Sequence, residues 1–400
     1  MIPMPQNFND ITFLTGNLEC LEKATETKVL PVFSDEAVSF LSEMSNEILK
    51  DSRTKNYPDV AAYAFFLRKS SLIRLKEQVH NAEDRIGRGI ALHIAPSNVP
   101  VNFAVSFTDA LLAGNINIVR VSDKTFPQVG IICDAVNKVA DTKYPDMKPY
   151  IQVVRYPHND DITQSLSSMC DVRLIWGGNR TIANIRKAEL PPRAVEYCFA
   201  DRHSLAVIDA DAYLNADADL IAKGFYIDTL YTDQNACSSP RLVVWTGKEV
   251  EKAKDRFWTS FQQVAEKDYE LPVIKVVDKL DALCRLAVSG NKVKRVGKSN
   301  RVVRVQVEKL TSDLMNFKES GGLFFEYDAH DLCEIVPILT KPCQTIAYFG
   351  VDKQTLKNVI KNSGARGGDR VIPLGHTMDI SILWDGLNMV EAMSRLIISA

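Results

Sequence analysis

The chain has 400 residues, of which 46% are hydrophobic and 24% charged, and its formal net charge is −2. This length is too great for one small core and predicts two or three domains. The balance of 48 basic and 50 acidic residues argues against a nucleic-acid binder that depends on neutralising phosphates. No stretch reaches the roughly 18 uninterrupted apolar residues of a transmembrane helix, so we expect no membrane span.

The cysteine pattern indicates a reducing compartment. Eight cysteines are scattered along the chain without a C-x-x-C pair, and we expect most of them to be small core residues with reduced thiols. The first residues lack a basic start followed by an apolar core, so we expect no signal peptide and a cytoplasmic protein. No group of His, Cys, Asp and Glu has metal-ligand spacing, so we predict no metal site.

The first 85 residues are expected to be mainly helical. Residues 34–49 begin with a capping serine and carry apolar residues at helical spacing. A second helix is expected from about Pro58 to His80. We expect this segment, residues 1–85, to pack on a cofactor-binding domain.

Strands and helices alternate from Ile86 onward. Such alternation predicts a doubly wound α/β sheet, which binds ligands at the carboxyl ends of its strands. The expected dinucleotide-binding domain covers residues 86–230. Its predicted strands are 87–95, 117–121, 151–155, 172–176 and 205–209, and its predicted helices are 103–113, 126–140, 162–168 and 216–230.

A second α/β domain, which would carry the catalytic cysteine, is expected over residues 231–375. It would contain a long helix at 249–266 and a strand at 272–277. The closing segment, residues 376–400, is expected to return to the core or to form an oligomer interface. No linker rich in Pro, Gly or Ser marks the boundaries.

A polar loop at residues 231–241 contains one cysteine, Cys237, among Gln, Asn, Ser and Arg, and leads into an apolar run. This pattern is typical of a loop that brings a reactive group to the end of a buried strand. A positive charge from Arg241 or from a helix N-terminus would favour the thiolate. We therefore predict that Cys237 is a covalent nucleophile.

Several motifs resemble the aldehyde dehydrogenase superfamily. The turn Pro-Ser-Asn-Val-Pro at 96–100, the stretch at 117–123 and the cysteine loop occur in that order. The sequence is more closely similar to the LuxC-type acyl-CoA reductases, the reductase of the bacterial bioluminescence fatty-acid reductase complex. That resemblance covers most of residues 35–400. The segments that carry it are Ala95-Pro-Ser-Asn-Val-Pro100, Asp233-Gln-Asn-Ala-Cys-Ser-Ser-Pro240, Gln344-Thr-Ile346 and Trp384-Asp-Gly386.

The resemblance implies an aldehyde-dehydrogenase-like fold with a doubly wound cofactor domain and an α/β catalytic domain. It also implies that Asn98 donates its amide to the oxyanion formed when Cys237 attacks a thioester, although Asn98 also suits an ordinary turn. The residues implied or predicted to bind the cofactor are Ser97, Arg120, Ser122, Asp123, Gly177, Gly178 and Thr181.

The choice of cofactor stays open between NADPH and NADH. An acid beside the ribose, here Asp123, usually favours NADH because it accepts from the 2′-hydroxyl. Arg120 would instead pair with the 2′-phosphate of NADPH. The resemblance points to NADPH.

One departure from many aldehyde dehydrogenases concerns hydrolysis. The glutamate that activates water in those enzymes is not at its place, which is occupied by Phe199-Ala-Asp-Arg-His203, although Glu196 lies three positions upstream. An enzyme that protects its acyl-cysteine from water is better without this glutamate, so its absence favours reduction of a thioester.

Other polar residues have simpler interpretations. His93 lies in an apolar strand and is expected to be a core histidine, whereas His203 and His376 are weaker candidates for acid–base groups. The glycine-rich segment 364–370 lacks Walker-loop spacing and is expected to lie near the active-site cleft.

We therefore expect a reductase of acyl-CoA or acyl-protein thioesters that uses NADPH or NADH. An acyl-donating partner enzyme and self-association into a homo-oligomer are implied by the resemblance. Two alternatives stay open: a hydrolytic aldehyde dehydrogenase that uses Glu196, and a non-catalytic subunit that binds an acyl group or a partner.

Overall fold

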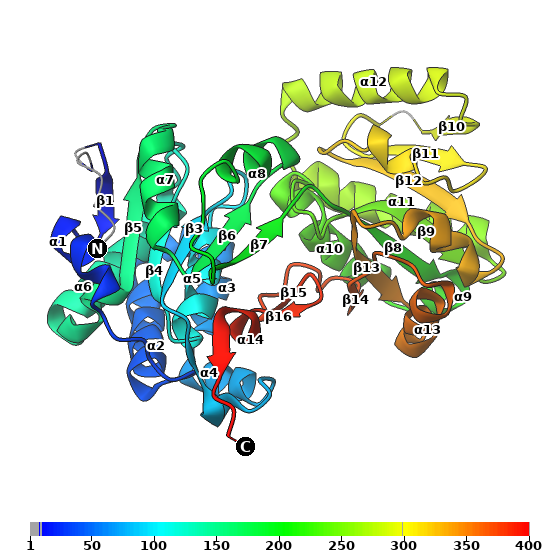
Figure 1. The fold of residues 1–400 in the computed structure, drawn as a ribbon. Coiled ribbons are helices and arrows are strands. Elements are labelled where there is room, and N and C mark those ends of the chain that lie inside the picture. The colour runs from blue at the N-terminus through cyan, green and yellow to red at the C-terminus, as the bar shows by residue number, and fades with distance from the viewer. Residues whose placement is uncertain (1–7, 9, 298, 400) are drawn as a thin grey trace. The chain divides into compact units, whose positions relative to one another are not determined.

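The computed structural model describes residues 8, 10–297 and 299–399, and the chain forms two compact units (Figure 1). The first unit comprises Met1–Ala200 and Ile380–Ala400, and the second comprises Asp201–Asp379. The chain leaves the first unit once and returns to it at its end. None of the helices in the described residues is long and apolar enough to span a membrane.

The first unit is built on a six-stranded sheet with the order β1-β5-β4-β3-β6-β7. All neighbouring strands are parallel except β1, which pairs antiparallel with β5. β4 and β5 extend the sheet on one side of β3, and β6 and β7 extend it on the other. The strands are β1 (Thr12–Thr15), β3 (Ile90–Ile94), β4 (Ile116–Arg120), β5 (Ile151–Arg155), β6 (Val172–Trp176) and β7 (Val195–Phe199).

This order confirms the predicted doubly wound sheet. The direction of the winding reverses between β3 and β6, so a crevice for a ligand is expected beyond the carboxyl ends of these two strands. Both strands are buried along their whole length, as is typical of a parallel sheet covered on both faces. Polar groups that bind a ligand must therefore come from the loops that follow the strands.

Helices complete the first unit. Ser34 caps α2, because its side chain accepts a hydrogen bond from the Ala37 N–H, and α2 packs against α3 and α6. The helices are α1 (Leu18–Glu22), α2 (Asp35–Lys50), α3 (Pro58–Phe66), α4 (Lys69–Lys76), α5 (Asn102–Leu112), α6 (Pro127–Thr142), α7 (Asp160–Met169), α8 (Asn179–Ile185) and α14 (Met389–Met393), with 3-10 turns η1 (Lys23–Thr25), η2 (Ser52–Asn56), η3 (Ala82–Asp84) and η4 (Pro145–Tyr150).

The end of the chain is part of the first unit. β17 (Ser394–Leu396) pairs antiparallel with β2 (Arg85–Gly87), and β15 (Leu383–Trp384) pairs with β16 (Leu387–Asn388). Apolar side chains of α14 are buried in the core of this unit. The side chain of Asn115 also donates to the Met393 carbonyl at 3.0 Å, which ties the end of the chain to the start of β4.

The second unit is built on a seven-stranded sheet with the order β10-β11-β12-β9-β8-β13-β14. All neighbours are parallel except β10, which is antiparallel to β11. The elements are β8 (His203–Asp209), α9 (Ala210–Leu214), α10 (Ala218–Asp228), η5 (Leu230–Thr232), β9 (Pro240–Thr246), α11 (Val250–Asp268), α12 (Val273–Val288), β10 (Val293–Val296), β11 (Val303–Val307), η6 (Leu314–Phe317), β12 (Leu323–Asp328), η7 (Leu332–Ile338), β13 (Cys343–Phe349), α13 (Lys353–Ser363) and β14 (Arg370–Pro373).

The boundary between the units differs from the one expected at residue 230. β8 and α10 were assigned to the dinucleotide-binding domain, but β8 lies between β9 and β13 in the second sheet. The sequence pattern of a strand followed by a helix is the same in both α/β sheets. This local pattern does not specify which strand will lie beside β8, so it could not assign β8 to a sheet.

The predicted strand at 87–95 is in fact two strands. Gly89 has a φ of 146°, a conformation that glycine adopts far more readily than other residues, and it separates β2 from β3. An added Cβ at Gly89 would lie 1.8 Å from the Asp171 carboxylate. A larger residue at this position would therefore collide with the Asp171 side chain.

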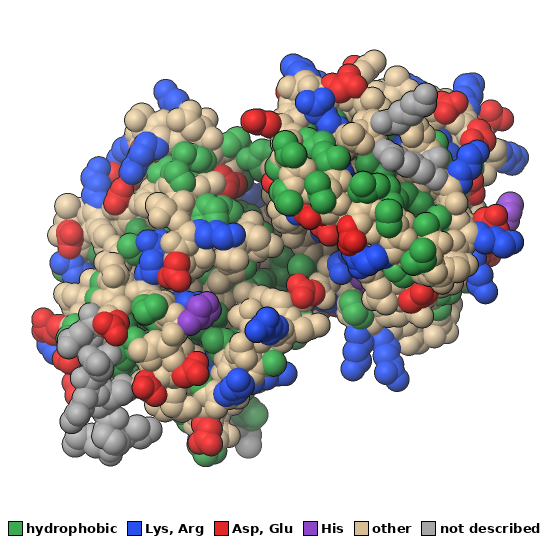
Figure 2. Space-filling model, turned by 90° about the horizontal axis from the view of Figure 1, so that it is seen from above, with side chains coloured by type: hydrophobic (Ala, Val, Ile, Leu, Met, Phe, Trp, Pro, Cys, Tyr) green, Lys and Arg blue, Asp and Glu red, His purple; other side chains and the backbone are tan. Residues whose placement is uncertain are grey.

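The predicted strand at 272–277 is wrong, because these residues begin helix α12. The β-branched run Val-Ile-Lys-Val-Val favoured a strand. The helix is instead fixed by contacts on one face, where Lys279, Ala282 and Leu286 are buried at helical spacing. Several apolar residues on the other side of α12 are exposed, and Figure 2 shows apolar side chains gathered on this part of the second unit.

A buried ion pair offers a test of the second sheet. Glu326 on β12 is fully buried and accepts hydrogen bonds from Arg304 and from the Trp258 indole, each at 2.7 Å. Glu326→Ala should lower the free energy of unfolding by about 3–5 kcal/mol, because it leaves the Arg304 charge uncompensated. Denaturant unfolding followed by tryptophan fluorescence measures this change.

The matched control is Glu308→Ala. Glu308 pairs with Lys292 at the surface, where both side chains are more than two-thirds exposed, and such pairs contribute at most about 1 kcal/mol. Equal losses in the two variants would contradict a special role for the buried pair.

Candidate functional site

The loop after β3 forms the first part of the site and belongs to the first unit. Residues 95–101 connect β3 to α5, and Ser97 and Asn98 are exposed in this connection. The Ala95 N–H donates to the Arg120 carbonyl at 2.9 Å, which joins the loop to the end of β4. The predicted oxyanion residue, Asn98, therefore lies at the carboxyl edge of the sheet, beside the switch point.

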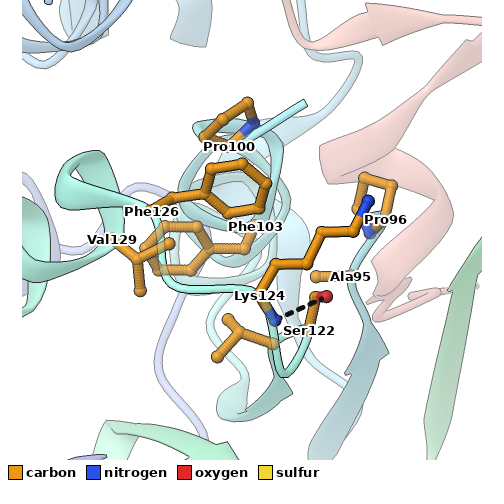
Figure 3. Close-up of a pocket in the computed structure, with 9 residues that line it drawn as sticks. Ala95, Pro96, Pro100, Phe103, Ser122, Lys124, Phe126 and Val129 are labelled. Carbon is orange, nitrogen blue, oxygen red and sulfur yellow. Dashed lines mark hydrogen bonds between the residues drawn. The ribbon is translucent and has the colours of Figure 1, made fainter. Parts of the chain in front are cut away.

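The residues after β4 lie against the same loop. Ser122 and Pro96, from two separately predicted motifs, line one small pocket with Lys124 and Phe126 (Figure 3). Figure 3 shows the Lys124 side chain extending from the end of β4 toward Pro96. Neither Lys124 nor Phe126 was predicted, although Lys124 directly follows the predicted Asp123.

Arg120 and Ser122 are held by neighbouring groups. The Arg120 guanidinium lies 4.9 Å from the centroid of the Tyr156 ring and donates to the Tyr156 carbonyl at 3.2 Å. Arg155 donates to the Ser122 carbonyl at 3.1 Å, and the Ser122 hydroxyl accepts from the Lys124 N–H at 3.2 Å. These contacts orient Arg120 toward Tyr156 and leave the exposed Asp123 and Lys124 as the charged groups at the strand end.

The two glycines after β6 stand on the other side of the switch point. Gly178 occupies the N-cap position of α8, and Thr181 lies in the first turn. A Cβ at Gly177 would lie 3.2 Å from the Thr181 side chain, so glycine allows the turn to pass close to the helix. Gly177 and Gly178 are half-buried, and the Gly177 N–H donates to the Phe199 carbonyl at 3.2 Å. That the phosphates of a dinucleotide lie near these glycines stays a prediction.

The cysteine loop belongs to the second unit and connects η5 to β9. Asp233 and Gln234 have φ values of 53° and 58°, a left-handed conformation that turns the chain sharply. The buried Gln234 amide donates to the carbonyls of Pro240 and Leu323 at 3.0 and 3.2 Å and accepts from the Gly322 N–H at 2.9 Å. One buried side chain thus joins both ends of the loop to the start of β12.

The backbone of Cys237 is anchored to the centre of the sheet. Its carbonyl accepts a hydrogen bond from the Ser204 hydroxyl at 2.7 Å, and the same hydroxyl accepts from the Thr345 N–H at 3.1 Å. Cys237 itself is half-buried. A half-buried thiol on a rigid backbone can be reached by a substrate while its position stays fixed.

Arg241 supplies a buried positive charge behind the loop. Its guanidinium donates to the Glu319 carbonyl at 2.5 Å and to the Gln234 carbonyl. Burial lowers the pKa of Arg241 to about 10, while the charges of Cys237 and Glu319 oppose that shift, so the group stays protonated near neutral pH. The Arg241 charge thus interacts with Cys237, and the expectation that it favours the thiolate stays a prediction.

A second loop beside the cysteine was not predicted. Asp228, at the end of α10, accepts from the N–H groups of Gly375 and Thr377 at 2.6 and 2.9 Å. The Ser238 hydroxyl lies 3.3 Å from the Met378 sulfur, so this segment lies against the cysteine loop. Burial raises the pKa of Asp228 to about 6. No local motif identified Asp228, because its role depends on a segment far along the chain.

The histidine candidates have different environments. His93 is fully buried, with its ring nitrogens 2.7 Å from the Ser106 hydroxyl and 3.1 Å from the Asn117 side-chain oxygen, which confirms a core histidine. Burial lowers the pKa of His203 to about 4, so it is neutral near pH 7. His376 is exposed and lies 2.8 Å from the Asp379 carboxylate.

Glu196 forms ion pairs with two arginines. Its carboxylate oxygens accept from Arg173 at 2.5 Å and from Arg186 at 2.6 Å. Partial burial would raise the pKa of Glu196, but these hydrogen bonds outweigh it and hold the pKa below its usual value. A carboxylate with a lowered pKa and two cationic partners is a poor general base.

The remaining cysteines only partly follow the expectation of core residues. Cys133, Cys170 and Cys343 are buried, whereas Cys284 and Cys333 are exposed. Among the residues that the structure describes, no group of three or more His, Cys, Asp or Glu is arranged to hold a metal ion. The glycine-rich segment 364–370 lies beside the start of β13, where the Gly368 N–H donates to the Cys343 carbonyl at 2.9 Å.

The structure brings only some of the predicted residues together: among the predicted cofactor residues Ser122 lines the pocket, whereas Ser97, Arg120 and Asp123 do not. Residues of the 96–100 turn and of the stretch after β4 meet in the first unit, and Cys237 and Arg241 meet in the second. Asn98 and Cys237 stand on different units, so their joint action on one oxyanion stays a prediction.

The family model for acyl-CoA reductase (LuxC) matches residues 37–267. The long-chain acyl-protein thioester reductase of Aliivibrio fischeri is 29% identical over 180 residues, which cover 42% of this chain and 36% of that protein. The protein of the same name from Vibrio harveyi is 28% identical over 170 residues, which cover 42% and 34%. The match therefore spans about a third of the length of these relatives.

Solved structures of aldehyde dehydrogenases share the fold. A 1-pyrroline-5-carboxylate dehydrogenase from Thermus thermophilus superposes with a TM-score of 0.64 at 12% identity and covers 96% of this chain and 83% of its own. An NAD-dependent benzaldehyde dehydrogenase from Corynebacterium glutamicum gives 0.64 at 14% identity, with 94% and 88% covered. These similarities confirm the predicted aldehyde-dehydrogenase-like α/β fold.

The anchor of the cysteine loop can be tested by Ser204→Ala. This change leaves the Cys237 carbonyl and the Thr345 N–H without their shared partner and should cost about 1–3 kcal/mol of stability. Hydrogen exchange should become faster in peptides that contain residues 234–241 and 343–349. Ser363→Ala, which removes a hydroxyl from an exposed helix end, is the control. Unchanged exchange in the cysteine loop would contradict the anchoring role.

Proposed function

Because the chain belongs to the LuxC family of acyl-CoA reductases, we propose that it reduces an acyl thioester to the aldehyde through an acyl-cysteine at Cys237. The observation that carries this proposal is the cysteine loop. Its one thiol is half-buried, its backbone is fixed by Ser204, and a buried arginine charge lies behind it. A scaffold that only binds acyl groups has no need of this arrangement.

In the proposed reaction, the Cys237 thiolate attacks the thioester carbonyl carbon and forms a carbon–sulfur bond. The developing oxyanion is stabilised by the Asn98 side-chain amide and the Cys237 backbone N–H. The bond to the carrier thiol then breaks, and the acyl group stays on Cys237. Thioester carbonyls are electrophilic enough to be reduced, whereas carboxylates are not, which is the chemical reason to retain the acyl group on sulfur.

The aldehyde-dehydrogenase-like fold and the family imply a nicotinamide cofactor. When bound, this cofactor supplies the hydride. The groups proposed to hold it are Ser97, Arg120, Ser122 and Asp123 on one side of the switch point and Gly177, Gly178 and Thr181 on the other. We propose NADPH as the preferred form, with NADH as the alternative, because Lys124 adds a cation beside Asp123 at the end of β4.

The proposed substrates are acyl-CoA and acyl-protein thioesters. The curated relatives are named long-chain acyl-protein thioester reductases, which supports a long acyl chain and an acyl-donating partner enzyme. The described cysteines are all free thiols, which supports the proposed cytoplasmic location.

A hydrolytic aldehyde dehydrogenase is the alternative activity. It requires a carboxylate that deprotonates water beside the acyl-cysteine. The sequence offered Glu196 for this task, but Arg173 and Arg186 occupy its oxygens and lower its pKa. The electrostatics of Glu196 therefore support reduction.

Acyl transfer is tested with radiolabelled long-chain acyl-CoA. The wild-type chain should become covalently labelled without cofactor and should release labelled aldehyde when NADPH is added. Cys237→Ala should take no label, because the nucleophile is gone. Cys284→Ala, which removes an exposed cysteine elsewhere in the second unit, should behave as wild type. Label in Cys237→Ala equal to wild type would overturn the proposal.

The role of Glu196 is tested by Glu196→Gln. The variant should unfold at lower denaturant concentration, because two ion pairs are weakened, but the acyl-enzyme should be hydrolysed at the wild-type rate. The exposed Glu189→Gln is the control. A large fall in labelled free acid from Glu196→Gln alone would favour the hydrolytic alternative.

A further inference from the structure

Two consecutive residues of the cysteine loop, Asp233 and Gln234, have left-handed backbone conformations, with φ values of 53° and 58°. This conformation is costly for residues that carry a Cβ, because the Cβ crowds the backbone. Such conformations persist only where the surrounding structure fixes them, and they cluster at functional sites. Cys237 follows four positions after Asp233, so contacts that fix this turn also limit where the thiol can lie.

The backbone of Asp233 is fixed by the segment at residues 319–322. The Gly321 N–H donates to the Asp233 carbonyl at 2.9 Å. Gly321 is held in turn from α12, because the buried Lys279 donates to its carbonyl. A Cβ at Gly321 would lie 2.8 Å from the Lys275 side chain, so glycine allows α12 to approach this closely. The carbonyl of Asp233 is therefore bonded to a segment that is itself anchored.

The side chain of Asp233 is held by Tyr269, the residue that caps the C-terminal end of α11. The Tyr269 hydroxyl donates to the Asp233 carboxylate at 2.8 Å. Burial and this hydrogen bond raise the pKa of Tyr269, so the hydroxyl stays protonated and is the donor. The backbone of Tyr269 is fixed as well, since its N–H donates to the Ala265 carbonyl at 3.1 Å and its carbonyl accepts from Arg301 at 3.2 Å.

A second tyrosine near the end of α11 makes a different kind of contact. The Tyr226 hydroxyl, on α10, donates to the Asp268 carbonyl at 2.8 Å and so joins two helices that pack against each other (Figure 1). The Tyr269 hydroxyl instead bonds to the side chain of a residue in the strained turn before the nucleophile. A hydrogen bond to that side chain opposes any backbone rotation that would move the carboxylate away.

We propose that Tyr269 is a positioning residue for Cys237, because its hydroxyl holds Asp233 in the left-handed conformation and so fixes the place from which the thiolate attacks. This inference rests on the proposed function of Cys237 as the acyl-accepting nucleophile. Tyr269 acts through Asp233 and does not itself contact the reacting atoms. Misplacing a reacting atom by about 1 Å can lower a rate about 100-fold, so loss of this one hydroxyl should be visible in the acylation step.

The test is the single-turnover rate at which Cys237 takes a radiolabelled long-chain acyl group from acyl-CoA, measured over a range of acyl-CoA concentrations. Tyr269→Phe, which removes only the hydroxyl, should lower the rate constant at saturation about 10-fold and leave the half-saturating concentration within about 2-fold of wild type. The matched control Tyr226→Phe removes the same group beside the same helix end and should behave as wild type. An unchanged rate constant in a folded Tyr269→Phe chain would overturn the proposal.

Asp233→Gly tests whether Tyr269 acts through Asp233. Glycine adopts the left-handed conformation readily and has no carboxylate for the hydroxyl to hold. In the Asp233→Gly chain, the further change Tyr269→Phe should therefore alter the acylation rate constant less than about 2-fold. A fall of about 10-fold from Tyr269→Phe in both backgrounds would contradict the proposal, because the hydroxyl would then act elsewhere.

Hydrogen exchange separates a failure of this inference from a failure of the proposed function, because it needs no acyl substrate. In peptides that span residues 231–241, exchange should be faster in Tyr269→Phe than in wild type and in Tyr226→Phe. If wild type takes no acyl label, the proposed function fails, and exchange alone decides whether Tyr269 holds the turn. Equal exchange in all three chains would then overturn that role, as would a change in the half-saturating concentration alone where wild type is labelled.

Discussion

Both units depend on the same constraint, which is that a parallel sheet covered on both faces leaves little room for polar chemistry along its strands. Strands β3 and β6 are buried throughout, so reactive and ligand-binding groups stand on the loops after the strands or on the loops that enter them. The carboxyl ends of parallel strands share one edge. For this reason the 96–100 turn and the stretch after β4, which are separated in sequence, line one pocket.

The cysteine loop shows how a reactive group can be held without its own secondary structure. Gln234 supplies three hydrogen bonds from one buried amide, and Ser204 links the Cys237 carbonyl to β13. Arg241 donates from its two terminal nitrogens to backbone carbonyls, which do not neutralise its charge, and its buried Nε makes no hydrogen bond within the described residues. That unneutralised charge is available to stabilise a thiolate nearby.

The success of the sequence predictions depended on whether a feature was local. The alternation of strands and helices, the bounds of β5 and β6, the cysteine loop and the core role of His93 all follow from patterns within short windows. The assignment of β8 to a sheet failed, because it depends on its neighbours in space. Asp228 and Lys124 were missed for the same reason: the first acts on a distant loop, and the second gains its role from the pocket it lines.

The misassigned start of α12 was informative. Its run of Val and Ile predicts a strand, because β-branched residues favour the extended conformation. The structure makes these residues helical and exposed, while Lys279 is buried on the opposite face. The hydrogen bonds of Lys279 to the carbonyls of Asn300 and Gly321 hold that face of α12 inward, so the apolar residues on the opposite face stay at the surface. Tertiary contacts therefore decide which face of this helix is buried, and the local sequence does not carry that information.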